Sequence, residues 1–258
     1  MSSPTWTRVA LSSEFRRFDG SCWRLVEAQH RISTLKLADS LAEQALLEDL
    51  IEETKPAIPP DCRHLDFLLA TPFRYGAFYP HGSRFRRAGR TLGVYYAAET
   101  PATALSEMAF YRLLFFAESP ATPWPSDAAE YTAFSAEIAT GQLFDLTQEP
   151  LSADQAIWSD LTNYEGCQAF AEAARSVKAE VIRYRSVRDP ARGANYAMLV
   201  CGAFSKPSPS ERQTWRMRLS ASGIQALCEF PRQAVEFPRG AFSADPRVAA
   251  LNWERPEL

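Results

Sequence analysis

The amino-acid sequence predicts a single α+β domain. Segments rich in β-branched and aromatic residues alternate along the chain with segments of helical periodicity. No internal repeat, low-complexity tract or linker divides the 258 residues, and a chain of this length can bury one substantial core. Residues 1–20 are expected to form an N-terminal arm, residues 21–230 the domain, and residues 231–258 a tail packed on its surface.

The first part of the chain predicts a strand and a helix. Residues 21–27, SCWRLVE, have the composition of a short strand. Residues 35–53 show helical spacing, and their many acidic side chains indicate a solvated outer face on which a partner could dock. Pro56 and two further prolines end this helix. Residues 62–81 have no clean period, so no element is predicted there.

A strand followed by a helix is predicted in the centre of the chain. Residues 92–97 form an aromatic and β-branched run, Thr100 suits a helix N-cap, and Pro101 suits the first helical position. The next apolar positions step by four, three and four residues and predict a buried face made of Ala104, Met108, Tyr111 and Phe115. Glu107 shares this face, where a carboxylate needs donors or a cation. The alternative is a glutamate that reaches past the edge of the core.

The second half of the chain predicts a loop, a hairpin and two helices. Three prolines make residues 119–127 a loop. Strand-like composition before and after Gly141 predicts a β-hairpin of residues 131–138 and 143–146. Ser152 has the spacing of a capping box, which predicts a helix through Trp158 and Leu161, and an alanine-rich helix follows over residues 167–178. Further strands are predicted from residue 181, in the hydrophobic run that ends at residue 204, and over residues 214–219 and 224–229.

Charge and cysteine content disfavour several classes of protein. The net charge of −3 argues against a general nucleic-acid binder, although arginines cluster at positions 84, 86, 87 and 90. The five cysteines lack the spacing of a metal knuckle or a disulfide framework, so buried reduced thiols are expected. No secretion signal is recognised, and the apolar run of residues 196–204 is too short to span a bilayer. A soluble cytoplasmic protein is therefore expected.

The remaining polar residues suggest chemistry on a nucleotide. No glycine-rich phosphate loop, HExxH or GxSxG motif is present. Arginines in polar turns can bind phosphates, paired tyrosines can stack on a base, and a carboxylate can stabilise an oxocarbenium-like state. Together these groups suit a nucleotide whose N-glycosidic bond is cleaved. NAD+ is the expected substrate, and no metal is expected.

Four segments, in order, resemble the RES-domain family, the toxins of Xre-type toxin–antitoxin pairs. These segments are WR at Trp23-Arg24, GSRF at residues 82–85, VYYAAETPATALSE at residues 94–107 and YRSVRDPARGAN at residues 184–195. The resemblance covers roughly residues 20–230. It implies an ADP-ribosyltransferase-like fold, with a mixed or antiparallel β core, flanking helices and helical insertions. It also implies an Xre-type antitoxin as partner, without direct contact to nucleic acid or membrane.

The resemblance implies that Arg84, Tyr96 and Glu107 are the catalytic residues. Tyr95 is the rival of Tyr96, because neighbouring strand residues face opposite ways. The spacing of eleven residues between Tyr96 and Glu107 (107 − 96) matches the strand-to-helix distance of the family, so the resemblance favours Tyr96. The residues implied to bind substrate are Arg24, Tyr95, Ser186 and Asn195. Each position also has a purely structural alternative, for example a surface arginine at Arg84, a core ring at Tyr96 or a turn cap at Ser186.

The leading hypothesis is a toxin that cleaves the nicotinamide–ribose bond of NAD+ and arrests growth. ADP-ribose would pass to water, phosphate or a protein acceptor. One alternative is a mono-ADP-ribosyltransferase that modifies a specific protein target. Another is an inactive subunit that forms a complex or regulates DNA, which the intact set of Arg84, Tyr96 and Glu107 argues against.

Overall fold

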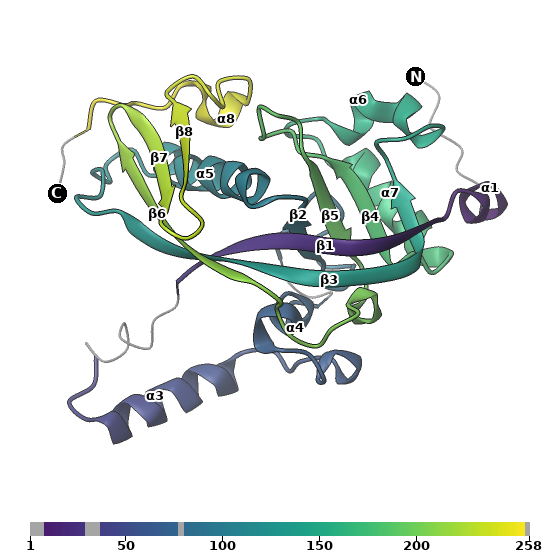
Figure 1. Cartoon of the computed structure of the whole chain (residues 1–258), viewed down its shortest axis with the longest axis horizontal. Helices are drawn as coiled ribbons and strands as arrows, with labels where there is room; N and C mark the ends of the chain where they lie inside the picture. The colour runs from purple at the N-terminus through teal and green to yellow at the C-terminus, as the bar shows by residue number, and fades with distance from the viewer. Residues whose placement is uncertain (1–7, 29–36, 77–79, 256–258) are drawn as a thin grey trace.

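A mixed β-sheet forms the centre of the molecule (Figure 1). The computed structural model describes residues 8–28, 37–76 and 80–255. Within them, eight strands follow the order β1-β2-β5-β4-β3-β6-β7-β8. The strands are β1 (Arg16–Glu27), β2 (Tyr95–Ala98), β3 (Ala129–Asp145), β4 (Val181–Arg185), β5 (Ala194–Met198), β6 (Arg212–Ser220), β7 (Gly223–Cys228) and β8 (Gln233–Pro238). The predicted α+β class is confirmed.

The sheet closes on itself around its first five strands. Strand β1 pairs with β2 and also, over most of its length, with β3. The chain of pairs β2-β5-β4-β3 then returns to β1. Only the β3–β4 pair is parallel among the pairings that the structure describes. This closure brings the ends of β1, β2 and β5 together, although they are far apart in the sequence.

Helices cover the sheet on several sides, and α3 projects from the body in Figure 1. Helix α5 packs with β6, β7, β8 and α8 around one apolar cluster. Helix α4 covers a second cluster, and α7 a third that includes β4. The helices are α1 (Arg8–Ser13), α3 (Leu41–Thr54), α4 (Phe67–Arg74), α5 (Pro101–Glu118), α6 (Gln155–Trp158), α7 (Glu165–Ser176) and α8 (Pro246–Ala249). None of these described helices is long and apolar enough to cross a membrane.

The central helix begins as predicted, but a different face of it is buried. Thr100 caps α5, since its side chain accepts a hydrogen bond from the Thr103 N–H, and Pro101 is the first residue. Tyr111 and Phe115, predicted to be buried, are 54% and 49% exposed. Ala104 is buried as predicted, and the rest of the core face is the neighbouring stripe of Leu105, Ala109, Phe110, Leu113 and Phe116. Glu107 therefore does not lie on the core face.

The predicted hairpin around Gly141 is wrong. Residues 129–145 form the single strand β3. Strand β1 pairs with it from Tyr131 to Leu143, β6 pairs with its first six residues, and β4 joins it at Leu143. A glycine between two strand-like runs resembles a turn in the sequence. Pairing with distant strands keeps this segment extended, and local composition does not reveal that pairing.

Other boundaries also differ from the prediction. Strand β1 begins at Arg16, five residues before the predicted start, and α3 is exposed as expected but begins at Leu41. Ser152 does not cap a helix; its hydroxyl donates to the carboxylate of Glu149. Helix α4 occupies part of residues 62–81, for which no element was predicted. The predicted loop at 119–127, the helix at 167–178 and the strands at 181, 214–219 and 224–229 are confirmed with small shifts. The strand predicted in the run that ends at residue 204 is shorter: β5 ends at Met198, and Cys201–Ala203 form a 3-10 helix.

The cysteine prediction is wrong for one pair. The structure joins Cys62 and Cys201 by a disulfide, with their Cα atoms 5.4 Å apart. These residues are separated by 139 positions, so the pairing follows from the fold and not from a sequence spacing. The other three cysteines are free and buried, as expected.

Candidate active site

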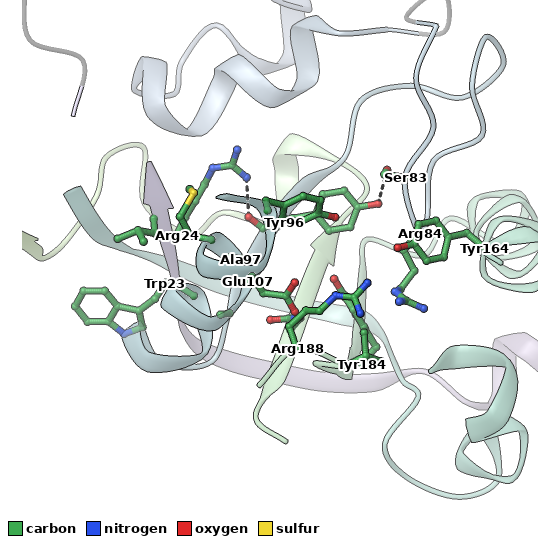
Figure 2. A pocket seen from close by; sticks show the side chains of 17 residues that line it. Trp23, Arg24, Ser83, Arg84, Tyr96, Ala97, Glu107, Tyr164, Tyr184 and Arg188 are labelled. Carbon is green, nitrogen blue, oxygen red and sulfur yellow. Dashed lines mark hydrogen bonds between the residues drawn. The ribbon is translucent and has the colours of Figure 1, made fainter. Parts of the chain in front are cut away.

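A pocket of about 320 Å³ lies where β1, β2 and β5 meet the first half of α5 (Figure 2). This volume suits a small-molecule ligand. A stripe of α5 at helical spacing faces it: Ala104, Glu107, Met108 and Tyr111. The apolar stripe predicted from the sequence thus lies at the boundary of core and cavity: Ala104 and Met108 pack against the core cluster and also line the pocket, which Tyr111 lines as well.

The carboxylate of Glu107 is held by two short hydrogen bonds. Its Oε1 accepts one from the hydroxyl of Ser186 and one from Nδ2 of Asn195, both at 2.6 Å. The Ser186 hydroxyl also accepts from the backbone N–H groups of Arg188 and Asp189, so the turn fixes its orientation. Within the described chain, Oε2 of Glu107 makes no hydrogen bond. The site therefore presents one oriented carboxylate oxygen to a ligand.

Asn195 carries a buried acceptor with no partner. Its side chain lies in β5 and is 3% exposed, and its Oδ1 has no hydrogen-bond partner among the described residues. Buried amide oxygens are nearly always hydrogen-bonded in folded proteins. Because Asn195 lines the pocket, its Oδ1 is available to a hydroxyl or N–H group of a bound ligand.

Neighbouring tyrosines of β2 face opposite sides of the sheet. Tyr96 lines the pocket, and its hydroxyl pairs with the Ser83 hydroxyl at 2.8 Å and accepts from the Phe85 N–H at 2.9 Å. Burial raises the pKa of Tyr96, so the hydroxyl is neutral at physiological pH. Tyr95, which was expected to contact substrate, is fully buried between Phe73 and Phe204 and does not line the pocket. The sheet geometry thus answers which tyrosine faces the cavity.

Two arginines of the predicted set line the pocket. Arg84 is 8% exposed, donates from Nη1 to the carbonyl oxygen of Trp158 at 2.8 Å, and lies 4.5 Å from the ring centroid of Tyr164. Arg24 donates from Nη1 to the Tyr96 carbonyl oxygen at 2.7 Å. Arg84 is therefore not a surface arginine, and its Nε and Nη2 have no hydrogen-bond partner among the residues described.

Several pocket residues were not predicted as site residues: Tyr111, Tyr164, Tyr184 and Arg188. Tyr184 and Arg188 lie within the segment YRSVRDPARGAN, so membership of that motif was the signal that could have found them. Tyr164 lies at the start of α7, and no sequence feature marks it. Burial raises the pKa of Tyr184 well above its usual range.

One group of potential metal ligands lies outside the pocket. Among the described residues, Asp61, Cys62 and Cys201 bring three ligand atoms close together. The two thiols are joined in the disulfide, which removes them as thiolate ligands. The cluster therefore adds nothing to the chemistry of the pocket.

The model of the RES domain family matches residues 58–220, which is more than half of the chain. The protein therefore belongs to the RES domain family, as the sequence motifs predicted. No curated protein shows significant similarity to it.

A solved structure is also similar over nearly the whole chain. It is a chain from the crystal structure of the M. tuberculosis MbcT-MbcA toxin-antitoxin complex, with 13% sequence identity and a TM-score of 0.45. The similarity covers 94% of this protein and 97% of that chain.

Proposed function

We propose that the protein is the toxin of a toxin–antitoxin pair and cleaves the nicotinamide–ribose bond of NAD+. Membership of the RES domain family supports this proposal. The observation that carries it is the carboxylate of Glu107, which Ser186 and Asn195 fix inside a pocket that Arg84 and Arg24 also line. An Xre-type antitoxin is the proposed partner.

The residues of the pocket have complementary tasks in this reaction. The bond between ribose C1′ and the nicotinamide nitrogen breaks, and its electron pair leaves with the neutral base. The free oxygen of Glu107 stabilises the positive charge that develops on the ribose, and Asn195 Oδ1 accepts a hydrogen bond from a ribose hydroxyl. The unused N–H groups of Arg84 bind phosphate oxygens. The rings of Tyr96 and Tyr164 offer flat surfaces for the bases.

An acceptor oxygen then attacks C1′ and loses its proton. If the acceptor is water, the product is ADP-ribose; if it is phosphate, the product is a phosphorylated ADP-ribose. A protein acceptor would make the protein a mono-ADP-ribosyltransferase. The chemistry at Glu107 is the same in all three cases, so product analysis must identify the acceptor.

The decisive experiment incubates purified protein with NAD+ labelled in the adenosine, with and without phosphate and with and without cell extract. Released nicotinamide and the labelled products are quantified. The control is Glu107→Gln, which keeps the shape of the side chain and removes its charge. We expect nicotinamide release to fall by roughly two or more orders of magnitude in this variant. Equal release by both proteins would remove Glu107 from the reaction, and no release by the wild type would refute the proposed function.

A further inference from the structure

The C-terminal segment, residues 239–255, reaches the pocket through one buried ion pair. Asp245 lies directly before α8, 25 residues beyond the end of the family match (245 − 220). Its side chain is 1% exposed, and its Oδ2 lies 2.8 Å from Nη1 of Arg188, whose side chain is 4% exposed. Arg188 lines the pocket. Asp245, a residue outside the matched region, therefore holds the guanidinium group of Arg188 in the wall of the pocket.

Arg188 is held in one orientation from several sides. Besides Asp245, the carbonyl oxygen of Leu161 accepts from Nη2 at 3.1 Å, and the guanidinium carbon lies 3.8 Å from the ring centroid of Phe110. Asp245 is in turn fixed by Arg247, which donates to it from the backbone N, Nε and Nη2. The remaining N–H donors of the Arg188 guanidinium are not used by any residue that the structure describes. The group is thus preorganised and still able to bind a ligand.

The pocket carries an excess of positive charge. Its charged lining residues, within the described chain, are Arg24, Arg84, Arg188 and Glu107, a formal sum of +2 (3 − 1). Asp245 does not neutralise this excess, because Arg247 shares its carboxylate. Burial opposes ionisation of Asp245, but the hydrogen bonds from Arg247 and the charge of Arg188 hold its pKa below its usual range. The ion pair is therefore intact at neutral pH.

We infer that Arg188 binds substrate phosphate together with Arg84, and that Asp245 is the positioning residue that sets Arg188. Figure 2 shows Arg84 and Arg188 in the same pocket as Glu107. Guanidinium groups with free donors match the oxygens of a pyrophosphate, which carries two negative charges. The pocket is thereby selective for nucleotides with a pyrophosphate and against the riboside that lacks phosphates. This inference rests on the proposed function for its substrate.

The competing explanation is that the Arg188–Asp245 pair only anchors the C-terminal segment. A buried ion pair is weak evidence of any function, and breaking it destabilises a protein in either case. The two explanations differ in substrate selectivity. If Arg188 is only an anchor, its substitution should change the kinetics of every substrate equally. If it binds phosphate, its substitution should change the kinetics only of substrates that contain phosphate.

The test compares kcat and KM for NAD+ and for nicotinamide riboside in the wild type, Arg188→Lys and Asp245→Asn. Arg188→Lys keeps the charge but loses the guanidinium fork, so its KM for NAD+ should rise roughly 10- to 100-fold with kcat changed only a few-fold. Asp245→Asn should raise KM in the same direction by a smaller factor. Turnover of the riboside should be the same in all three proteins. The inference would be overturned if the variants lost kcat/KM equally for NAD+ and for the riboside, or if they lost none for NAD+.

Arg255→Gln is the matched control for anchoring. Arg255 is 9% exposed and ties the same segment to the end of α5, where it donates to the carbonyl oxygens of Phe116, Ser119 and Thr122. It does not line the pocket. The variant should lower Tm while its KM for NAD+ stays at the wild-type value. A KM increase as large as that of Arg188→Lys would favour the anchoring explanation.

Two measurements on the intact wild type keep the inference testable if the variants fold poorly or if NAD+ is not cleaved. In calorimetry, ADP should bind and adenosine should not, and the affinity for ADP should fall as salt is raised. In hydrogen exchange, ADP should slow exchange at the amides of Arg247 and Val248, because a ligand on Arg188 also stabilises Asp245. Equal affinity for adenosine, or unchanged exchange at these amides, would contradict a phosphate contact at Arg188.

Discussion

At the scale of single residues, the pocket depends on side chains that bind to more than one element. Ser186 and Asn195 join Glu107 of α5 to the turn after β4 and to β5. The hydroxyl of Tyr96 joins β2 to the turn that carries Arg84. A side chain that is attached only to its own helix or strand can still change rotamer. Contacts from a second element remove that freedom, so they fix the position of the charged group.

The first prediction separates Tyr96 from its neighbour Tyr95. Tyr96→Phe removes the partner of the Ser83 hydroxyl and of the Phe85 N–H, which should lower the free energy of unfolding by roughly 1–3 kcal/mol. The Arg84 turn would loosen, so KM for NAD+ should rise on the order of 10-fold. Thermal unfolding and steady-state kinetics measure the two effects.

Tyr95→Phe is the control for this substitution. The Tyr95 hydroxyl is buried and has no hydrogen-bond partner in the described chain, so its removal should leave both stability and KM at about their wild-type values. If the two variants behaved alike, the hydroxyl of Tyr96 would not be what positions the turn.

Buried tyrosines also predict how stability depends on pH. Burial raises the pKa values of Tyr95 and Tyr184 well above the usual range, so the folded state keeps protons that the unfolded state releases near pH 10. The free energy of unfolding should therefore be constant at neutral pH and fall as pH rises above about 10. Tm measured between pH 8 and pH 11 tests this. The Tm of Tyr95→Phe should fall less steeply than that of the wild type over this range. Identical Tm curves for the two proteins would contradict the raised pKa of Tyr95.

At the scale of elements, the sequence predicts local segments better than it predicts their pairing. The Thr100 cap and the Pro101 start of α5 were predicted correctly, because a cap is a local interaction. The hairpin at Gly141 was wrong, because only the pairing of β1 with β3 on both sides of Gly141 shows that the strand continues. The buried face of α5 was predicted correctly at Ala104 but wrongly at Tyr111 and Phe115, for a related reason. Apolar residues that line a pocket and apolar residues that pack in the core have the same helical spacing.

The candidate site was predictable to the extent that its residues belong to short motifs. Arg84, Tyr96 and Glu107 do lie together, and so do Ser186 and Asn195. The sequence did not predict the ion pair of Asp245, because the two partners of that pair are far apart in the chain. It also gave no sign that α8 packs against α5.

Two glycines of strand-forming segments should respond oppositely to substitution. A Cβ at Gly93, just before β2, would lie 2.3 Å from the Pro72 carbonyl oxygen and 2.8 Å from the Phe73 Cα. Backbone atoms of α4 cannot move aside cheaply, so Gly93→Ala should lower the free energy of unfolding by about 1–3 kcal/mol. Because Tyr96 follows in β2, activity should fall as well. Denaturant unfolding and nicotinamide release measure these effects.

Gly141→Ala is the control in the interior of β3. Nothing lies within 4 Å of a Cβ at this position, so alanine should be neutral or stabilise the protein by about 0.4–1 kcal/mol. Marked destabilisation by this variant would mean that residue 141 needs a turn conformation, as the hairpin hypothesis assumed.

At the scale of the whole molecule, the pocket is completed by segments from most of the chain. Strand β1 supplies Arg24, the centre supplies Arg84, Tyr96 and Glu107, and the C-terminal segment supplies Asp245 behind the wall. The pairing of β1 with both β2 and β3 brings the first two of these segments together, and the packing of α8 against α5 adds the third. A pocket with an excess of positive charge favours anionic ligands.

The last prediction concerns the cell and rests on the proposed function. Induction of the wild type alone should arrest growth, and cellular NAD+ should fall before growth stops, because an unrestrained NAD+-cleaving enzyme drains the redox carrier. Co-expression of an Xre-type antitoxin should prevent the arrest by covering the pocket. A carboxylate of that partner would contact Arg84 and its neighbours, where substrate phosphates otherwise bind. Binding of the antitoxin should therefore compete with NAD+, and its apparent affinity should weaken as NAD+ is raised.

Glu107→Gln is the matched control in the same cells. It should be harmless and should still bind the antitoxin, because the cationic part of the pocket is unchanged. Growth arrest by this variant would show that toxicity does not need the reaction. Arrest by the wild type at a normal NAD+ level would count against bulk NAD+ depletion, and it would favour ADP-ribosylation of a specific protein. Labelled NAD+ added to an extract would then mark that protein as a single band, which Glu107→Gln should not produce.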